Sequence, residues 1–552
     1  MRLNLPVYTY SHRSQPASTA RLVNCWPELM PPGSKTPVLL TRSPGVKAWS
    51  TVGSGSIKGM YRAKIGFSDD YGGRVDRLYV VSGRELYAVD AAKSATLLGD
   101  IGTDSGIDFS HNTDSLVVVN NPRGYYYDGR AHAGTHTAAG NNATVMTDSA
   151  ATFIPDALIG LEILNTTDGS VGLITDNDET TVTVEALYGG TDNDWDTSDA
   201  YFISSLQQML DEDFTSRGAA SVEFLENFLL FREPNSDRMF GANLGSTSEF
   251  DALDFVNSDT NPDLLLDMIS INRSLLCFSE ETTEFFENTG VSGFPFERNI
   301  NGTMQVGIAA AGLVGIVFDM VHFVADDDTV RRVEGNQPVK ISSHWVERFL
   351  GKATLSMGKT ISYWEEGHFF IGWTFPEGTI VFDSVTNEWH ERKSYREQYW
   401  RPSFITKFDG KWLAGDPLSN AIVEIDQETY SDSLADQYTG SNIQRMEWTY
   451  QPVYAEQNDA FHDRLEVVFD VGSGLTIGQG SDPKMMMQYS DDSGRTWKAL
   501  PDRSMGKRGK YLERVHWNNL GKSKARVYRG AVSDPIPVTI TDTVIEVRGG
   551  RL

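Results

Sequence analysis

The chain has 552 residues and a mass of 61.3 kDa, which is too long for one ordinary domain, so we expect two to four. Charged residues make up 22% of it, Gly occurs 50 times, and the formal net charge is −27. This composition disfavours a coiled coil, a helical repeat or wholesale disorder. The acidic balance argues against a protein that binds nucleic acid through a general positive field.

The sequence shows no sign of membrane insertion or of a metal centre. Residues 1–14 lack the apolar core of a signal peptide, and the longest apolar run, Ile308 to Phe318, is shorter than the roughly 18 residues of a membrane span. We interpret the two cysteines, Cys25 and Cys277, as reduced and packed in a protein that matures in a reducing cytosol. We therefore expect no membrane span, metal or cofactor.

A repeat runs along most of the chain. Its unit is a β-rich run, a short Gly, Asn or Asp turn, and a second β-rich run. The units begin at Arg77, Ser115, Val222, Ser270, Val317, Tyr363 and Ile405. Five of the six steps between them span 38 to 48 residues, which is typical of propeller blades. We predict an all-β fold with a β-propeller of six or seven blades, and an open series of hairpins is the alternative.

The exceptional step, from Ser115 to Val222, is 107 residues long and predicts an insertion. There is no Lys or Arg between Arg130 and Arg217, whereas residues 131–216 contain 15 Asp and Glu. Short β-rich runs separated by Asp-Gly and Asn-Asp turns occur in the same stretch. We therefore expect a small acidic β module at 135–205, carried at a loop tip.

Three aspartates within this module, Asp192, Asp194 and Asp196, alternate along the chain as in a calcium loop. Such a loop also needs Gly at 197 and Glu at 203, where this chain has Thr197 and Ile203. We therefore interpret the three residues as part of a solvated acidic face rather than as a metal site.

The composition changes near the C-terminus. From Lys484 to Arg529 there are 12 Lys and Arg against 4 Asp and Glu, so this part and the acidic module either face different partners or are solvated surfaces. Strand-like alternation here predicts a closing β-sandwich-like domain. The expected domains are a 1–50 N-terminal segment with the first propeller strand, blades at 51–134, the inserted module at 135–205, blades at 206–432, and the C-terminal domain at 433–552.

A short motif in the C-terminal domain matches the Asp-box pattern S-x-D-x-G-x-T-W. Its members are Ser490, Asp492, Gly494, Thr496 and Trp497. We expect the Asp to cap turn amides, the Gly to take a positive φ, and the Trp to pack the strand onto its sheet. The motif predicts a structural hairpin and has no bearing on catalysis.

We find no pattern that identifies a catalytic site. Asp boxes occur in sialidases, and Phe231–Pro234 faintly matches their F-R-I-P signature, but it lies mid-chain after several hairpins. There is one Asp box, and the remaining arginines and the Tyr–Glu pair of a sialidase cannot be placed. Trp389–Arg392 is explained better by packing than by catalysis. We predict that the protein is not an enzyme, and a glycan-binding or glycan-cleaving propeller is the alternative.

Several strings, spread in order over nearly the whole chain except 131–205, resemble the tail hub proteins of short-tailed phages. These proteins are also called packaged DNA stabilization proteins or tail accessory factors, and they correspond to the nozzle of other podovirus tails. The strings are Val23–Glu28, Pro32–Pro37, Ser43–Lys47, Glu249–Phe255, Phe294–Arg298, Asn387–Arg392, Gly478–Pro483, the Asp box and Val532–Pro535. None is a catalytic signature, so the resemblance carries over architecture and not active-site residues.

The resemblance implies a virion protein, assembled in the host cytoplasm, that forms a homo-hexameric ring below the portal and the adaptor. Such a ring would continue the DNA channel, retain packaged DNA until ejection, and dock a tail needle or plug and tailspikes or fibres. Six copies would carry −162 formal charges, so duplex DNA would slide through without sequence recognition. The acidic charge could equally serve solubility alone.

Overall fold

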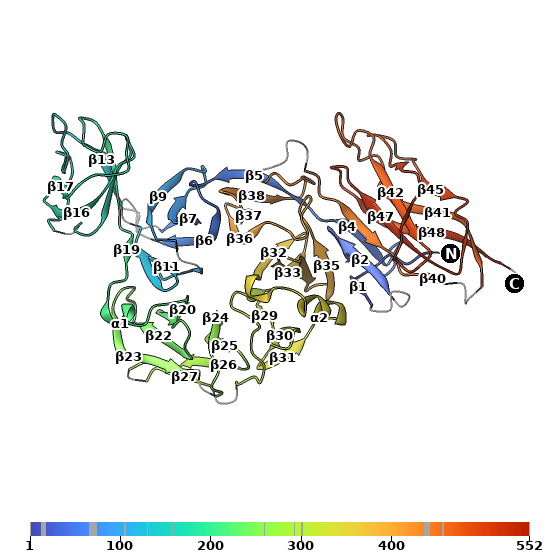
Figure 1. The fold of residues 1–552 in the computed structure, drawn as a ribbon, viewed down its shortest axis with the longest axis horizontal. Coiled ribbons are helices and arrows are strands. Elements are labelled where there is room, and N and C mark those ends of the chain that lie inside the picture. Colours follow the sequence, from blue (N-terminus) through green and yellow to red (C-terminus); the bar gives the residue numbers. More distant parts are fainter. Residues whose placement is uncertain are drawn as a thin grey trace. The chain divides into compact units, whose positions relative to one another are not determined.

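The computed structural model shows a chain built almost wholly of short strands, most of them antiparallel (Figure 1). It describes residues 2–12, 18–65, 74–103, 106–129, 131–156, 158–258, 260–291, 293–299, 302–434, 442–454 and 458–550. The helical elements are α1 (Glu212–Thr215), α2 (His344–Leu350) and the 3-10 turn η1 (Leu355–Met357). No helix in these ranges has the length and apolar character needed to span a bilayer. The all-β prediction is confirmed.

The chain divides into two compact units. The first consists of Met1–Thr51, Phe278–Glu284 and Ile300–Leu552, and the second of Val52–Cys277 and Phe285–Asn299. Both contain four-stranded antiparallel sheets of the kind that forms a propeller blade.

Four of these sheets follow one another from residue 57 to residue 298. Their strands are β6 (Ile57–Ile65), β7 (Val75–Ser82), β8 (Glu85–Val89) and β9 (Ala95–Asp100); β10 (Ile107–His111), β11 (Leu116–Asn120), β12 (Arg123–Tyr127) and β19 (Gln207–Gln208); β20 (Ser221–Leu225), β21 (Phe228–Arg232), β22 (Arg238–Ala242) and β23 (Phe250–Asn257); and β24 (Leu265–Ile271), β25 (Ser274–Ser279), β26 (Thr283–Asn288) and β27 (Phe296–Arg298).

Local sequence explains these hairpins. Between β20 and β21 the chain turns in two residues, Glu226 and Asn227, which both take a positive φ, as the tightest hairpin turns require. In β11 every residue is buried: Leu116 and Val118 pack on one side, and Val117 and Val119 on the other. A strand buried on both faces is expected where one blade is stacked between two others.

The inserted module interrupts the second of these sheets, between its third and fourth strands. Its strands are β13 (Ala131–Thr135), β14 (Val145–Thr147), β15 (Glu162–Asn165), β16 (Val171–Asn177), β17 (Thr181–Val184) and β18 (Ala200–Ser204). They pair in the order β13-β18-β15-β16-β17-β14 around a core that includes Ile163, Val182 and Trp195, and they form a separate lobe of the second unit (Figure 1). Its entry and exit strands, β13 and β18, pair with each other, with Ala131 opposite Ser204.

Three further four-stranded sets lie in the first unit. Their strands are β28 (Val314–Val317), β29 (Met320–Val324), β30 (Val330–Glu334) and β31 (Gln337–Lys340); β32 (Lys359–Glu365), β33 (His368–Phe375), β34 (Gly378–Asp383) and β35 (Glu388–Arg392); and β36 (Ser403–Phe408), β37 (Lys411–Gly415), β38 (Ala421–Asp426) and β5 (Gly45–Thr51). Counted over the described residues, seven four-stranded sets are present, one of which (β32–β35) belongs to a larger 12-stranded sheet. The N-terminal strand β5 completes the last set by pairing with β38.

The remaining strands form two sheets that share one core. The first sheet has β1 (Tyr10–Ser11), β2 (Thr19–Val23), β39 (Met446–Thr449), β40 (Val453–Tyr454), β42 (Lys484–Ser490), β43 (Lys498–Ala499), β44 (Arg503–Ser504) and β47 (Ala525–Val532). The second has β3 (Cys25–Leu29), β4 (Val38–Arg42), β41 (Ala460–Phe469), β45 (Val515–Asn518), β46 (Lys522–Ser523) and β48 (Thr539–Gly549). Leu22, Leu40, Trp448 and Trp517 meet between them, which makes the pair a β-sandwich.

The sandwich therefore contains strands from both ends of the chain. The sequence-based boundary at residue 433 leaves out β1 to β4, which the structure joins to this domain. Their partners lie several hundred residues away, so nothing in the local pattern of the N-terminal segment indicated that they belong there.

Candidate functional site

The Asp box forms a closed network of hydrogen bonds after β42. Oδ1 of Asp492 accepts from the backbone N–H of Arg495 (3.0 Å) and of Thr496 (2.8 Å), and Oδ2 accepts from the Thr496 hydroxyl (2.6 Å). The Ser490 hydroxyl donates to Asp492 Oδ1 (2.6 Å) and accepts from the N–H of Gly494 (2.8 Å), whose φ is +92°. The bonds from Ser490 and Thr496 hold the pKa of Asp492 well below its usual value, since they favour the carboxylate.

The tryptophan of the box contacts a side chain of the sheet to which its hairpin belongs. Arg529 of β47 lies over the Trp497 ring, with Cζ 4.1 Å from the ring centroid, and Trp497 itself is half-buried. The ring thus covers a guanidinium on the surface of the sheet. These contacts hold a turn in place and lie within the sandwich.

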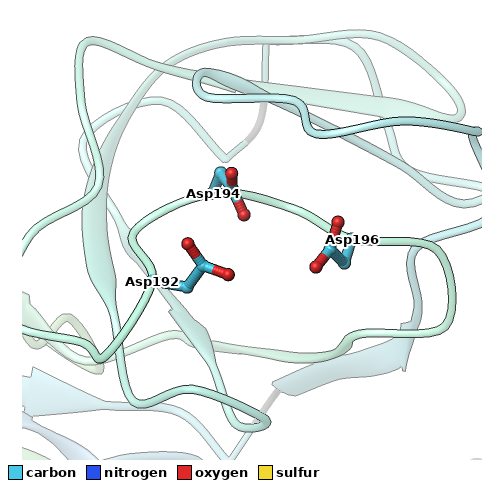
Figure 2. Close-up of side chains that lie close together, drawn as sticks. All are labelled: Asp192, Asp194 and Asp196. Atoms are coloured by element: carbon cyan, nitrogen blue, oxygen red, sulfur yellow. The ribbon is translucent and has the colours of Figure 1, made fainter.

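The three aspartates of the inserted module come together on one loop (Figure 2). Carboxylate oxygens of Asp192, Asp194 and Asp196 lie within 4.8 Å of one another, and Asp192 and Asp196 are exposed. The charge of Asp194 raises the pKa of Asp192, because neighbouring carboxylates oppose each other's ionisation. Asn141 donates to Asp194 Oδ2 over 3.1 Å, and the main effect of the cluster is a concentrated negative charge.

The residues weighed as parts of a sialidase site make contacts within their own blade and with the next one. Arg232, at the end of β21, donates to the Leu265 carbonyl (3.1 Å) and, more weakly, to the Ser221 hydroxyl (3.4 Å). Glu233 pairs with Arg238 over 3.6 Å. These interactions link neighbouring strands, so a structural role accounts for the Phe231–Pro234 string.

Trp389–Arg392 on β35 lies in the packed interior, and it adjoins a cluster of buried polar groups. His368 Nδ1 is 2.7 Å from Asp383 Oδ2. Burial disfavours the charge on His368, but the hydrogen bond and charge of Asp383 outweigh it and raise the pKa of the imidazole. Burial also raises the pKa of Glu365 to about 7, although Arg392 opposes this shift. The cluster stabilises the interior of β32–β35.

The string Val23–Glu28 forms the connection between the sandwich and the blades. Asn24 stands between β2 and β3 with a φ of 54°, a left-handed conformation that Asn tolerates. Its side-chain oxygen accepts from the N–H of Lys393 (2.9 Å), and its amide donates to the carbonyls of Lys393 (3.1 Å) and Arg445 (3.0 Å). One buried side chain thus clamps the segment after β35 and the segment before β39.

The next two residues are buried in different cores. Cys25 packs in the sandwich core, whereas Trp26 packs against the blades, with its ring centroid 5.2 Å from that of Phe370. Side chains of a strand alternate between its faces, so β3 joins two cores with adjacent residues. Cys25 and Cys277 are both buried and neither forms a disulfide with a described residue, and burial raises the pKa of the Cys25 thiol above its usual value.

Two buried arginines reinforce this junction. Arg42 donates to the carbonyls of Gln444, Asp534 and Ile536, the last over 2.9 Å. Arg392 donates to the Pro44 carbonyl (2.6 Å) and lies 4.0 Å from the Trp400 ring centroid. A guanidinium is planar and has five N–H donors, so each of these arginines can bind backbone carbonyls and contact an aromatic ring at the same time.

A cavity of about 590 Å³ opens at the same junction. Its charged lining consists of Arg21, Lys393, Arg396, Glu397, Arg445 and Glu447. Arg21 forms a bidentate ion pair with Glu391 (2.7 and 2.6 Å), and Arg445 pairs with Glu447 (3.3 Å). Cations outnumber carboxylates in this lining, so the cavity would attract an acidic group.

Five of the recognised strings therefore meet at one place. Val23–Glu28, Ser43–Lys47, Asn387–Arg392, Gly478–Pro483 and Val532–Pro535 all supply residues to the junction or its cavity. In the string Ser43–Lys47, residue 45 must be Gly, because any side chain there would collide with the backbone of Ser431. The sequence showed these strings but not that they lie together, because their positions depend on pairing between residues far apart in the chain.

Two profiles of known protein families together match most of the chain. The profile described as bacteriophage P22 Gp10, beta-propeller, a phage stabilisation family, matches residues 9–228 and 195–430. A second profile, described as bacteriophage P22 Gp10, beta-sandwich, matches residues 447–548. The predicted propeller, C-terminal sandwich and phage resemblance are confirmed. No curated protein matches the chain.

Solved structures resemble the chain only loosely. The computationally designed Ika8 protein is 11% identical and covers 69% of this chain and 100% of its own, with a TM-score of 0.33. Hsv2 of Kluyveromyces lactis is 8% identical and covers 61% and 97%, with a TM-score of 0.24. A putative 6-phosphogluconolactonase of Bacteroides fragilis is 9% identical and covers 65% and 87%, with a TM-score of 0.30.

Proposed function

Because the chain belongs to the bacteriophage P22 Gp10 family and is therefore a structural protein of a phage virion, we propose that it forms the hub of the phage tail. In this proposal six copies form a ring below the portal and the adaptor, continue the DNA channel, and retain packaged DNA until ejection. The ring docks a needle or plug and the tailspikes or fibres, and it assembles in the host cytoplasm.

The observation that carries this proposal is the junction between the blades of the first unit and the sandwich. A hub must hold its attachment surfaces in fixed positions while neighbouring rings bind it. Asn24, Trp26 and Arg392 join the two folds through buried hydrogen bonds and ring contacts rather than through a linker. Such contacts restrict relative movement of the sandwich and these blades.

The charge of the chain supports passage of DNA without binding. Six copies carry −162 formal charges, of which −72 lie outside residues 131–216, and a surface of this sign repels phosphate groups at short range. We further propose the division into an N-terminal segment, two sets of blades, an inserted module and a C-terminal domain at the boundaries given by the sequence, with β1 to β4 of the N-terminal segment completing the sandwich of the C-terminal domain. The glycan-active alternative gains no support from Arg232 or the Asp box, because their contacts are structural.

The proposal is tested with DNA-filled heads that carry portal and adaptor but lack this protein. We expect these heads to lose their DNA to added nuclease, and the purified chain to bind the adaptor as a ring and restore protection. The mass of the bound ring, measured by mass photometry, gives the number of copies. Heads that keep their DNA without the chain, or a chain that never binds the adaptor, would contradict the proposal.

A matched pair of variants tests the role of the junction. Asn24→Ala removes the clamp, whereas Asn272→Ala changes an exposed turn residue that also has a positive φ (56°). We expect Asn24→Ala to reduce protection of DNA at elevated temperature and Asn272→Ala to leave it unchanged. Equal protection by both variants would show that the junction does not contribute to DNA retention.

A further inference from the structure

Two loops at one end of the sandwich are joined into a compact projection, which we call the sandwich tip (residues 471–482 and 505–514). The Gly509 N–H donates to the Gly472 carbonyl (3.3 Å), and Arg508 donates to the Thr476 hydroxyl (2.8 Å). Neighbouring turns are closed by their own bonds, including Leu475 N–H to the Gly480 carbonyl (2.8 Å). The tip is therefore a formed surface with its own internal hydrogen bonds.

The tip combines exposed apolar and basic side chains. Leu512 is 95% exposed, Ile477 82% and Tyr511 70%. Lys507, Arg508 and Lys510 are also exposed, and no carboxylate of the described residues forms an ion pair with Lys507 or Lys510. Adjacent exposed apolar groups bordered by charge are typical of an interaction surface.

The inserted module carries a surface of opposite charge, which we call the acidic face (residues 154–156, 158–160 and 173–179). The two segments lie side by side, because Gly160 N–H donates to the Ile174 carbonyl and the Asn177 amide donates to the Ile154 carbonyl (both 2.9 Å). Ile154 (74% exposed), Ile159 and Leu173 are its exposed apolar side chains. Asp156, Asp176, Asp178 and Glu179 are its exposed acidic residues.

Charge complementarity points to one occupant for the sandwich tip. Residues 131–216 have 15 acidic residues and no Lys or Arg, whereas Lys484–Arg529 has 12 basic residues against 4 acidic ones. Each surface offers exposed apolar groups together with the charge that the other lacks, and both are present in every copy at equal concentration. Matching charge and apolar area is the usual basis of specific docking.

We propose that the sandwich tip of one copy binds the acidic face of the inserted module of a second copy. The contact joins two different surfaces, so each copy uses both. Contacts of this type form a ring when the rotation from copy to copy closes, as the proposed hub requires. This inference rests on the proposed tail-hub ring and gives the inserted module a function in it. It places the acidic face against a neighbouring copy and not on the wall of the DNA channel.

The test uses reciprocal charge reversal, with assembly on the adaptor followed by mass photometry. The tip variant is Lys507→Glu, Arg508→Glu and Lys510→Glu, and the face variant is Asp176→Lys, Asp178→Lys and Glu179→Lys. We expect each variant alone to assemble at least about tenfold more weakly than the wild type, because like charges then meet. A mixture of the two variants should regain assembly, and so should one chain that carries both sets of changes.

A control variant reverses cations of the sandwich outside the tip, with Lys484→Glu, Lys498→Glu and Lys524→Glu, and it should assemble like the wild type. Unchanged assembly of the tip or face variant, or a mixture that does not recover, would overturn the inference and leave the tail-hub proposal standing. Loss of adaptor binding by the face variant without loss of copy-to-copy contacts would also overturn it. A wild-type chain that never forms a ring on the adaptor would instead remove the tail-hub proposal.

Discussion

Asn24 pairs with the backbone of Lys393 as a neighbouring strand would. Its side-chain oxygen accepts from the Lys393 N–H and its amide donates to the Lys393 carbonyl, at 2.9 and 3.1 Å. The two residues are 369 positions apart in the sequence. These two hydrogen bonds join the residue that follows β35 to the residue that precedes β3, at a point where regular strand pairing has ended.

Two replacements of Asn24 separate the contributions of its hydrogen bonds and of its backbone conformation to the stability of the junction. Asn24→Gly keeps the left-handed backbone but loses the three hydrogen bonds, and we expect a loss of roughly 2–3 kcal/mol in unfolding free energy from unpaired buried groups. Asn24→Ala adds the strain of a positive φ, about 1 kcal/mol more. Denaturant unfolding of both variants checks the order. Equal stability of Asn24→Gly and Asn24→Ala would show that backbone conformation contributes nothing there.

Trp26 should be among the costliest residues of the first unit to truncate. It is 2% exposed and packs against Phe370 and His368, at centroid distances of 5.2 and 6.1 Å. Trp26→Ala leaves a cavity, and we expect a loss of about 3–5 kcal/mol in unfolding free energy. Trp364→Ala, at a ring that is 45% exposed, is the matched control and should lose about 1 kcal/mol. Similar thermal midpoints for both variants would contradict the packing role of Trp26.

The blades and the inserted module could be predicted from the sequence because their information is local. A blade is four consecutive strands, so its turns and alternation recur at a fixed period, and the 107-residue step at Ser115 exposed the module. The junction could not be predicted, since Arg21 pairs with Glu391 across 370 positions and β5 pairs with β38 from the other end of the propeller. Strings such as Val23–Glu28 indicated the family but not which core each side chain enters.

Stability should fall as the pH rises through the titration of Glu365. Burial raises its pKa from the ordinary 4.5 to about 7, so the folded state holds a proton that the unfolded state releases. Folding is therefore favoured below about pH 4.5, and the advantage declines by up to about 1.4 kcal/mol per pH unit until pH 7. Glu365→Gln should reduce this slope and stabilise the protein at pH 8, and half-buried Glu388, whose pKa is also raised to about 7, should keep part of the slope. Thermal unfolding across this pH range measures the change in stability, with the exposed residue Glu428 replaced in the control variant Glu428→Gln.

A slope that persists unchanged in Glu365→Gln would assign the pH dependence to other groups. The neighbouring pair also contributes to the pH dependence, because Asp383 acts in the opposite sense to Glu365 and His368 acts in the same sense. The depressed pKa of Asp383 gives stability that is lost as the pH falls through it. The raised pKa of His368 gives stability that is lost as the pH rises through it.

Asp492→Ala should loosen the Asp-box turn without unfolding the sandwich. The substitution removes the acceptor of the Arg495 and Thr496 N–H groups and of the Thr496 hydroxyl. We expect faster hydrogen exchange at these two amides and unchanged exchange in β41, which lies in the other sheet. The control is Asp502→Ala, which changes an exposed residue between β43 and β44. Protection retained at Arg495 and Thr496 would show that backbone geometry alone holds the turn.

The inserted module should be removable without loss of the blade that carries it. Ala131 and Ser204 pair across β13 and β18, so the two ends of the module are only about 5 Å apart, within reach of a short Gly-Ser link. β12 can still pair with β19 through Tyr125 and Gln208. We expect a folded chain that loses less than about 2 kcal/mol, the contribution of Phe202, which packs on the neighbouring blade core.

Circular dichroism, size-exclusion chromatography and thermal unfolding of this deletion measure the outcome. Removal of the four consecutive strands β28–β31 is the control, because it takes away a blade whose faces other sheets cover, and it should yield aggregated protein. Aggregation of the module deletion as well would show that β13–β18 is an integral part of the second unit. A soluble, cooperatively unfolding product would show that the module is an addition to a complete propeller, available for a contact that the blades do not make.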